Sequence, residues 1–126
     1  TALASSDVYQ CLSIPAESVI LHAGLQVTEV LTGTSSDVGY DLGITGGDVD
    51  NFVDGFDADG ASALAYAPTS AAYAPVLVSA ADTLDILVAA QTGTTLTGKI
   101  RVFATLMDIS DAGDMAANEV DRDTLA

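Results

Sequence analysis

The sequence predicts an all-β fold, an antiparallel β-sandwich or jelly roll with one short helix and an extended C-terminal tail. Apolar and polar residues alternate along several stretches, as in strands that bury one face. Turn-forming residues separate these stretches, and the helical segments that a parallel α/β sheet needs between its strands are missing. In addition, 49% of the 126 residues are hydrophobic, which suffices for the core of one domain.

Three strands are expected in the first third of the chain. Residues 8–14 alternate between two faces, and residues 38–44 alternate strictly between apolar residues and aspartate or glycine. Between them, residues 19–31 form the longest predicted strand. Its apolar face consists of Val19, Leu21, Ala23, Leu25, Val27 and Leu31. The opposite face, which carries His22 and Gln26, is expected to be exposed to solvent.

One segment changes its period from that of a strand to that of a helix. Its apolar residues stand at the spacing i, i+3, i+4 and i+7: Val49, Phe52, Val53 and Phe56. Asp48 suits the N-cap and Gly55 the end of the last turn. This spacing predicts one or two turns of helix over residues 48–54.

The second half of the chain predicts extended loops and then three more strands. Residues 57–75 are weakly patterned, and each copy of a Tyr-Ala-Pro repeat favours extended backbone before its proline. Strands follow at residues 76–79, 83–89 and 99–109. The last of these carries Ile100, Val102, Ala104 and Leu106 on one face and Phe103 and Met107 on the other. Apolar residues on both faces indicate a central strand or one that a partner chain covers.

The domain boundary is expected near residue 110. Residues 1–110 form the predicted sandwich domain, and residues 111–126 form an acidic tail that cannot fold alone. Its few apolar residues are too far apart for an amphipathic helix and suit an extended assembly arm, although a solvated terminus stays a competing interpretation. The predicted interface residues are Phe103, Met107, Met115, Val120, Arg122 and Leu125.

Charge narrows the classes of function. The chain has 18 acidic and three basic residues and a formal net charge of −15. Such a protein repels nucleic acid and anionic membranes, so neither is expected as a partner. It has one histidine, expected in a structural role, and one cysteine, Cys11, expected as a small buried or half-buried side chain. With so few catalytic groups, neither an enzyme nor a cofactor is predicted.

Calcium binding is the metal hypothesis that the composition raises. Five aspartates fall within twelve residues, and hard cations bind clustered oxygens: Asp48, Asp50, Asp54, Asp57 and Asp59. Their spacing does not match the calcium-binding loop of an EF-hand, and an acidic turn explains the same residues. No metal ligand is therefore assigned.

The order of short motifs along nearly the whole chain carries a further signal. Residues 7–33 read DVYQCLSIPAESVILHAGLQVTEVLTG, and residues 38–60 read VGYDLGITGGDVDNFVDGFDADG. AADTLD follows at residues 80–85, IRVFA at 100–104 and EVDRD at 119–123. In this order the motifs resemble small virion proteins of tailed bacteriophages. The resemblance implies a β-sandwich or jelly-roll subunit that typically forms trimers, without a catalytic motif.

Together, the resemblance and the acidic charge predict a non-enzymatic protein that decorates and reinforces the outer surface of a phage capsid. Its expected partners are other copies of itself, as a homotrimer, and the major capsid protein. A protein this acidic is better placed outside the shell than beside packaged DNA. The alternatives are a phage tail or head appendage and a secreted or cell-surface β-sandwich that binds glycans or calcium.

Overall fold

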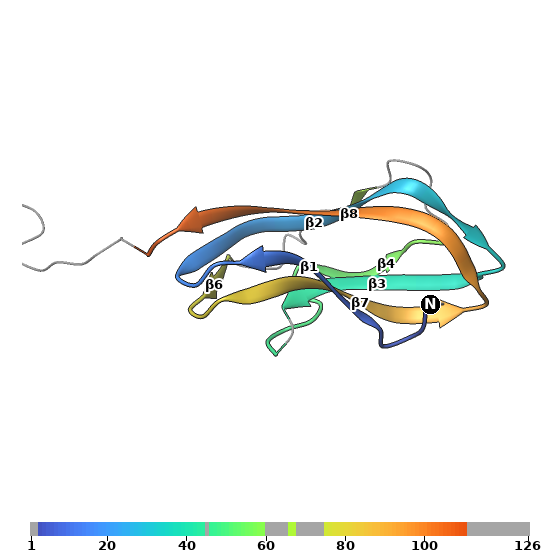
Figure 1. Cartoon of the computed structure of the whole chain (residues 1–126), viewed down its shortest axis with the longest axis horizontal. Helices are drawn as coiled ribbons and strands as arrows, with labels where there is room; N and C mark the ends of the chain where they lie inside the picture. Colours follow the sequence, from blue (N-terminus) through green and yellow to red (C-terminus); the bar gives the residue numbers. More distant parts are fainter. Residues whose placement is uncertain (1–2, 45, 60–65, 68–74, 111–126) are drawn as a thin grey trace, which may run out of the picture.

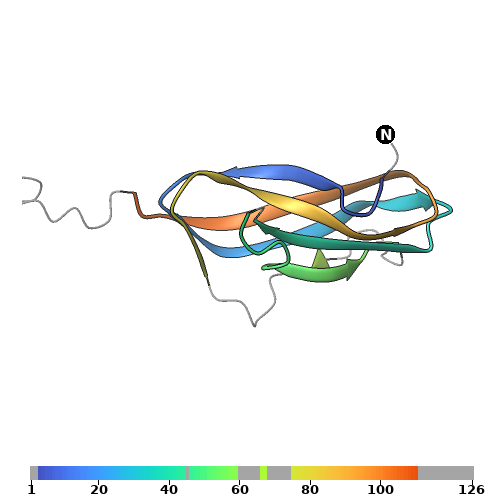
Figure 2. The ribbon, with the colours of Figure 1, turned by 90° about the horizontal axis from the view of Figure 1, so that it is seen from below.

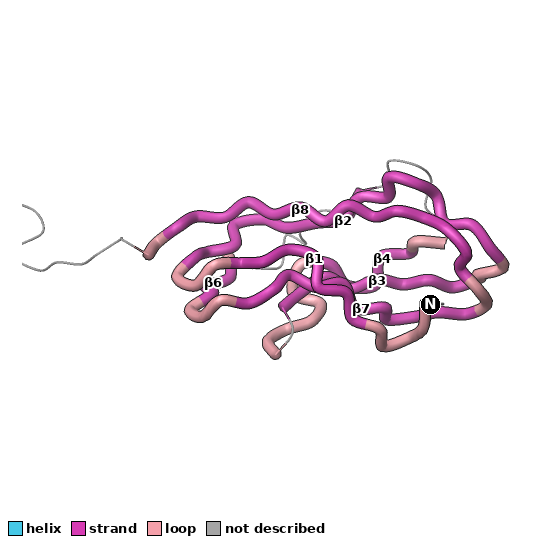
Figure 3. Tube along the Cα trace, viewed as in Figure 1, coloured by secondary structure: helices cyan, strands magenta, loops and turns pink. Residues whose placement is uncertain are grey.

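The computed structural model describes residues 3–44, 46–59, 66–67 and 75–110. Eight strands and no helix occur in this part of the chain (Figures 1 and 3). The strands are β1 (Val8–Ile14), β2 (Ser18–Gly33), β3 (Asp37–Ile44), β4 (Val53–Asp57), β5 (Tyr66–Ala67), β6 (Val76–Val78), β7 (Asp82–Thr92) and β8 (Thr95–Asp108). The all-β prediction is therefore confirmed for the described residues.

The strands form two antiparallel sheets. Sheet A has the order β1-β7-β3-β4. In sheet B, β2 pairs with β8 along one edge and with β6 and β5 along separate stretches of the other. Figure 1 shows the two sheets as separate layers, with β2 and β8 in one and β3 and β7 in the other, and Figure 2 shows them from below. The architecture is β-sandwich-like.

Two connections cross between the layers side by side at one end of the molecule. The first joins β2 to β3 and the second joins β7 to β8. The Thr34 N–H donates to the Thr94 carbonyl at 2.9 Å, and the Ser36 N–H donates to the Thr92 carbonyl at 3.1 Å. Gly93 is required here, since its φ is 81° and a Cβ would collide with the Thr34 carbonyl. The paired strands β2–β8 and β3–β7 thus continue from one sheet into the other.

The core lies between the sheets and takes residues from both. Leu25 and Val27 of sheet B and Leu42 and Leu84 of sheet A have no exposed surface. Phe52, in the turn before β4, completes one side of the core. Each sheet therefore buries one face against the other, as the alternation in the sequence predicts.

The predicted helix over residues 48–54 is wrong. This segment is a turn that leads into β4, and Phe52 N–H donates to the Leu42 carbonyl of the neighbouring strand. In the register of β4, Phe56 pairs with Tyr40 and Val53 pairs with Leu42, so a β-bulge places one extra residue between them. The bulge brings residues three apart to the same face, which imitates the period of a helix.

Two further bulges change the predicted facing of side chains. In β2, the ladder to β8 shifts between Ile20 and His22. As a result Ile20 is buried, whereas Leu21, predicted to face the core, is 45% exposed. In β1, the register shifts between Gln10 and Leu12, and Cys11 is exposed instead of half-buried. The predicted strand positions are confirmed, but the extra residues invert the phase of alternation.

Candidate functional site

The two layers differ sharply in charge. Sheet A and its loops contain no basic residue among those described and ten aspartates. These are Asp7, Asp37, Asp41, Asp48, Asp50, Asp54, Asp57, Asp59, Asp82 and Asp85. Sheet B and its adjoining turns hold three acidic residues and two basic ones, Lys99 and Arg101 of β8. The net charge of the described chain is thus concentrated in one layer, and both described cations lie in the other.

Apolar side chains gather on the outer face of sheet B. A row crosses three strands there, because Val19 of β2 pairs with both Leu77 of β6 and Met107 of β8. Leu77 is 61% exposed and Met107 is 46% exposed, and Leu21 lies next to the row. Large apolar residues grouped on a surface mark interaction sites more often than isolated ones do.

An aromatic pair extends this face along the strands. Phe103 of β8 lies opposite Gly24 of β2, and its ring stacks on His22 with centroids 5.9 Å apart. Further along, Arg101 lies opposite Gln26, and Lys99 forms an ion pair with Glu29 at 2.8 Å. We call this surface the docking face and define it by Val19, Leu21, Leu77, Phe103, Met107, Arg101 and Lys99.

Several aspartates of sheet A stabilise the backbone. The buried Asp41 accepts the Gly55 N–H at 2.7 Å and thereby fastens the bulge of β4. Asp59 accepts the Val38 N–H at 2.9 Å, and Asp7 accepts the Ala4 N–H at 2.9 Å. These carboxylates hold loops and strand ends in place. Their negative charge makes the hydrogen bonds stronger than bonds between neutral groups.

The remaining acidic residues near the β3–β4 turn do not form a metal site. The hydrogen bond that the protonated Asp50 carboxyl donates to Asp48, followed by weaker effects of burial and of the charges on Asp48 and Asp54, raises the pKa of Asp50. Within the described residues no group of three or more histidine, cysteine, aspartate or glutamate side chains could hold an ion. Of the five aspartates that fall within twelve residues, Asp59 thus binds the backbone, Asp48 and Asp50 belong to the turn, and Asp54 and Asp57 lie in β4.

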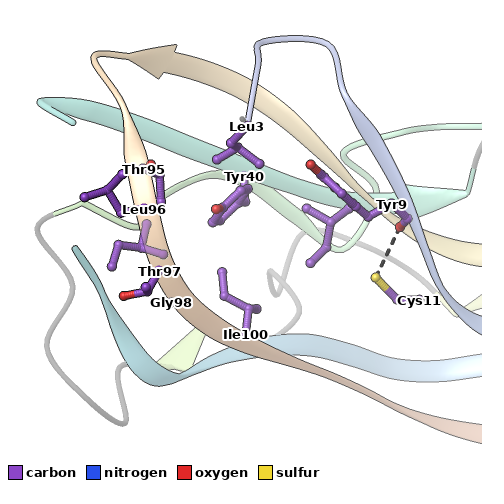
Figure 4. A pocket seen from close by; sticks show the side chains of 11 residues that line it. Leu3, Tyr9, Cys11, Tyr40, Thr95, Leu96, Thr97, Gly98 and Ile100 are labelled. Carbon is purple, nitrogen blue, oxygen red and sulfur yellow. Dashed lines mark hydrogen bonds between the residues drawn. The ribbon is translucent and has the colours of Figure 1, made fainter. Parts of the chain in front are cut away.

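A cavity of about 360 Å³ opens between the sheets beside β1 and β8 (Figure 4). Its walls are mostly hydrophobic, with the phenol groups of Tyr9 and Tyr40 among Leu31, Ile86, Leu96 and Ile100. The Tyr9 hydroxyl lies 3.5 Å from a carboxylate oxygen of Asp7. Partial burial, and then the charge of Asp7, raise the pKa of Tyr9, so this phenol stays neutral near pH 7.

The single cysteine and the single histidine lie far apart in the fold. Cys11 lines the cavity, where its Sγ donates to the Tyr9 carbonyl at 3.1 Å (Figure 4). Atoms packed around the sulfur raise the pKa of the Cys11 thiol, and the charge of Asp85 adds to this, although a backbone hydrogen bond at Ile86 opposes it. His22 lies on β2 in the other sheet. The structure therefore does not bring these two groups together as a nucleophile and a base.

Two of the six predicted interface residues lie in the described chain. Phe103 and Met107 both belong to the docking face, on the opposite side of β8 from Ile100 and Val102, as predicted. Met115, Val120, Arg122 and Leu125 lie outside the described residues. Sequence reasoning missed Leu77 and Leu21, because the first belongs to a strand of three residues and the second depends on a bulge.

Comparisons of the chain with models of protein families, with characterised proteins and with solved structures found no match. The described residues contain no helix that could cross a membrane. The resemblance to phage virion proteins thus stays a prediction from the sequence motifs.

Proposed function

We propose that this protein is a non-enzymatic structural subunit that decorates the outer surface of a phage capsid and binds it through the docking face. The observation that carries the proposal is the separation of charge and apolar surface between the layers. The acidic layer repels other anionic surfaces, whereas the docking face combines exposed apolar side chains with both described cations. A particle surface is therefore contacted by sheet B, and sheet A faces solvent.

The row formed by Leu77, Val19 and Met107 supports apolar contact at the centre of such an interface. Burying exposed leucine and methionine side chains contributes about 1.5–3 kcal/mol each. Arg101 contributes hydrogen bonds and orientation, because its planar guanidinium can bind a carboxylate through two nitrogens. The apolar row supplies affinity, and the cations select an acidic or neutral partner.

The proposal includes three finer statements. The expected partner is the major capsid protein, and several copies bound together would raise the effective affinity of each weak contact. The oligomer expected from the sequence is a homotrimer. The proposed jelly-roll topology rests on the two connections that carry paired strands from one sheet into the other.

The proposal is tested on phage particles from the source of the chain. Particles purified on a density gradient should contain the protein in a regular ratio to the shell protein, measured by mass spectrometry. Particles stripped of it should bind the added full chain saturably. Absence of the protein from such particles would contradict the proposal.

A pair of matched variants tests which face binds. Leu77→Asp adds a charge to the docking face, whereas Val49→Asp adds the same charge to a turn of the acidic layer, at a residue that is 40% exposed. Leu77→Asp should weaken particle binding at least tenfold, and Val49→Asp should leave it within about twofold. Equal binding by the two variants would show that another surface makes the contact.

The alternative of a glycan-binding or calcium-binding module has less support. The aromatic side chains described on the docking face are limited to Phe103 and its partner His22. In the acidic segment around β4, Asp59 binds the Val38 N–H, and among the described residues no group of three or more carboxylate, histidine or cysteine side chains could hold an ion. Isothermal titration with calcium chloride distinguishes this alternative, since a calcium module would release heat at a defined stoichiometry.

A further inference from the structure

The edges of the two sheets differ in how well they are protected from pairing with another strand. β4 has five residues, a bulge and two aspartates, and β5 and β6 have two and three residues. β1 has seven residues and is bulged at Cys11. β8 has fourteen residues, and the described chain places a strand along only one of its edges.

The second edge of β8 is also the most regular one. From Lys99 to Asp108 every residue of β8 has its own place in the ladder, and the extra residues of the bulges belong to β2. Residues 102–107 carry no charge, and β8 contains no proline. Natural edge strands are usually short, bulged, charged or interrupted by proline, and a long regular apolar edge pairs with another strand.

The same side of the molecule has few acidic residues. β1 approaches β8 there and has no charged residue between Val8 and Ile14. Val8 is 48% exposed and Tyr9 is 45% exposed. Chains that each carry a charge of −15 meet with the least repulsion on the side where acidic groups are fewest.

We propose that two copies of this chain pair in antiparallel orientation along their β8 edges, about a two-fold axis. The occupant is a second copy because charge repulsion is smallest between these two sides. The contact is two-fold because each copy contributes the same edge, that of β8. A closed ring of three would need a second, different long edge, and the described residues provide none.

The side of the sheet on which each side chain lies limits the register of this pair. Residues that face the same side of the sheet lie opposite each other in an antiparallel ladder. A register centred on Ala104 sets Val102 of one copy opposite Leu106 of the other, so the uncharged residues 102–106 pair among themselves and Met107 lies opposite Arg101. The two docking faces then lie side by side and stay open. This two-fold pair replaces the homotrimer expected from the sequence. Capsid binding through the docking face does not depend on which oligomer forms, so either proposal can fail alone.

The mass of the full chain in light scattering tests the pair directly. We expect a dimer at micromolar concentration in moderate salt. Association should strengthen as NaCl rises, because salt screens the repulsion between the acidic layers over a length of about 8 Å at physiological ionic strength. A monomer under all these conditions, or a trimer, would overturn the proposal.

Two threonine variants locate the contact. Thr105 is exposed on β8 near the proposed axis, and Thr92 is exposed at the end of β7. Thr105→Lys should raise the dimer dissociation constant about tenfold. The added lysine of each copy lies near the cations of the other copy, and the two-fold axis makes this repulsion occur twice. Thr92→Lys changes the net charge equally and should leave the constant within about twofold. Since both variants reduce the negative charge, general repulsion would predict stronger association in both.

Thermal unfolding shows whether each variant folds. A dimer that forms as strongly with a folded Thr105→Lys variant as with the unaltered chain would contradict pairing at the β8 edge.

Discussion

Sheet A and sheet B bury similar inner faces but present opposite chemistry to solvent. The loops and outer face of sheet A are acidic, and Asp41 and Asp59 bind backbone N–H groups there. The outer face of sheet B has a cross-strand apolar row, a histidine stacked on a phenylalanine, and the two described cations. The comparison shows that the negative charge of the described residues is not spread evenly over the two layers. It leaves one face suited to contact with another molecule.

The same difference appears at the strand ends. In sheet A, carboxylates satisfy backbone donors where the ladder is interrupted, as at the bulge beside Gly55. In sheet B, the interruptions fall within the ladder between β2 and β8. Acidic residues therefore have a structural reason to lie in sheet A, where many of them stabilise turns.

The largest effect is expected in the core that both layers share. Leu25 of sheet B and Leu42 of sheet A have no exposed surface. Leu25→Ala and Leu42→Ala should each lower the free energy of unfolding by about 2–5 kcal/mol, measured by urea denaturation. Leu96→Ala, at a residue that is 73% exposed, is the control and should change it by less than about 0.5 kcal/mol. Separate transitions for the two sheets would show that the layers are independent units.

A smaller effect should separate structural aspartates from solvated ones. Asp41→Ala leaves the Gly55 N–H without its acceptor and should cost about 1.5–3 kcal/mol in thermal or urea unfolding. Asp37→Ala removes an equal charge from an exposed position at the start of the same strand. If both variants gain stability equally, relief of charge repulsion outweighs the hydrogen bond, and Asp41 has no structural role beyond its charge.

The ion pair on the docking face should contribute little to stability. Lys99 and Glu29 are 2.8 Å apart, but their side chains are 74% and 46% exposed. Lys99→Gln should therefore change the free energy of unfolding only slightly, and the difference should shrink as NaCl screens the pair. A larger loss that is insensitive to salt would mean that packing of the lysine stem matters more than its charge.

The smallest expected effect is a difference in pH dependence between Asp50, which is half-buried, and Asp108, which is exposed. The hydrogen bond that protonated Asp50 donates to Asp48 raises the pKa of Asp50. The folded chain therefore binds more protons there than the unfolded one, and this term becomes more stabilising as pH falls through the raised value. Hydrogen bonds from Ser110 lower the pKa of Asp108, so that term is lost as pH falls.

These two terms are measured with Asp50→Asn and Asp108→Asn, by melting temperature across the acid range. Relative to the unaltered chain, Asp50→Asn should lose stability towards low pH, whereas Asp108→Asn should lose it towards neutral pH. Parallel curves for the two variants would contradict the opposite shifts.

Alternation along the sequence was sufficient to locate six of the strands, from residues 8–14 to residues 99–109, because a strand that buries one face must repeat every two residues. It also predicted that Phe103 and Met107 lie opposite Ile100 and Val102. Composition alone established the acidic charge.

Tertiary structure decided where that period breaks and which strands become neighbours. The bulge at Leu21 and His22 depends on the ladder that β2 makes with β8, more than seventy residues later in the chain. The bulge near Gly55 turned an apparent helix into a strand. The apolar row required β6, β2 and β8 to align at Leu77, Val19 and Met107, and the long edge of β8 required that no other described strand pair with it. Register and adjacency arise from hydrogen bonds between distant residues, which a local pattern of apolar and polar side chains does not encode.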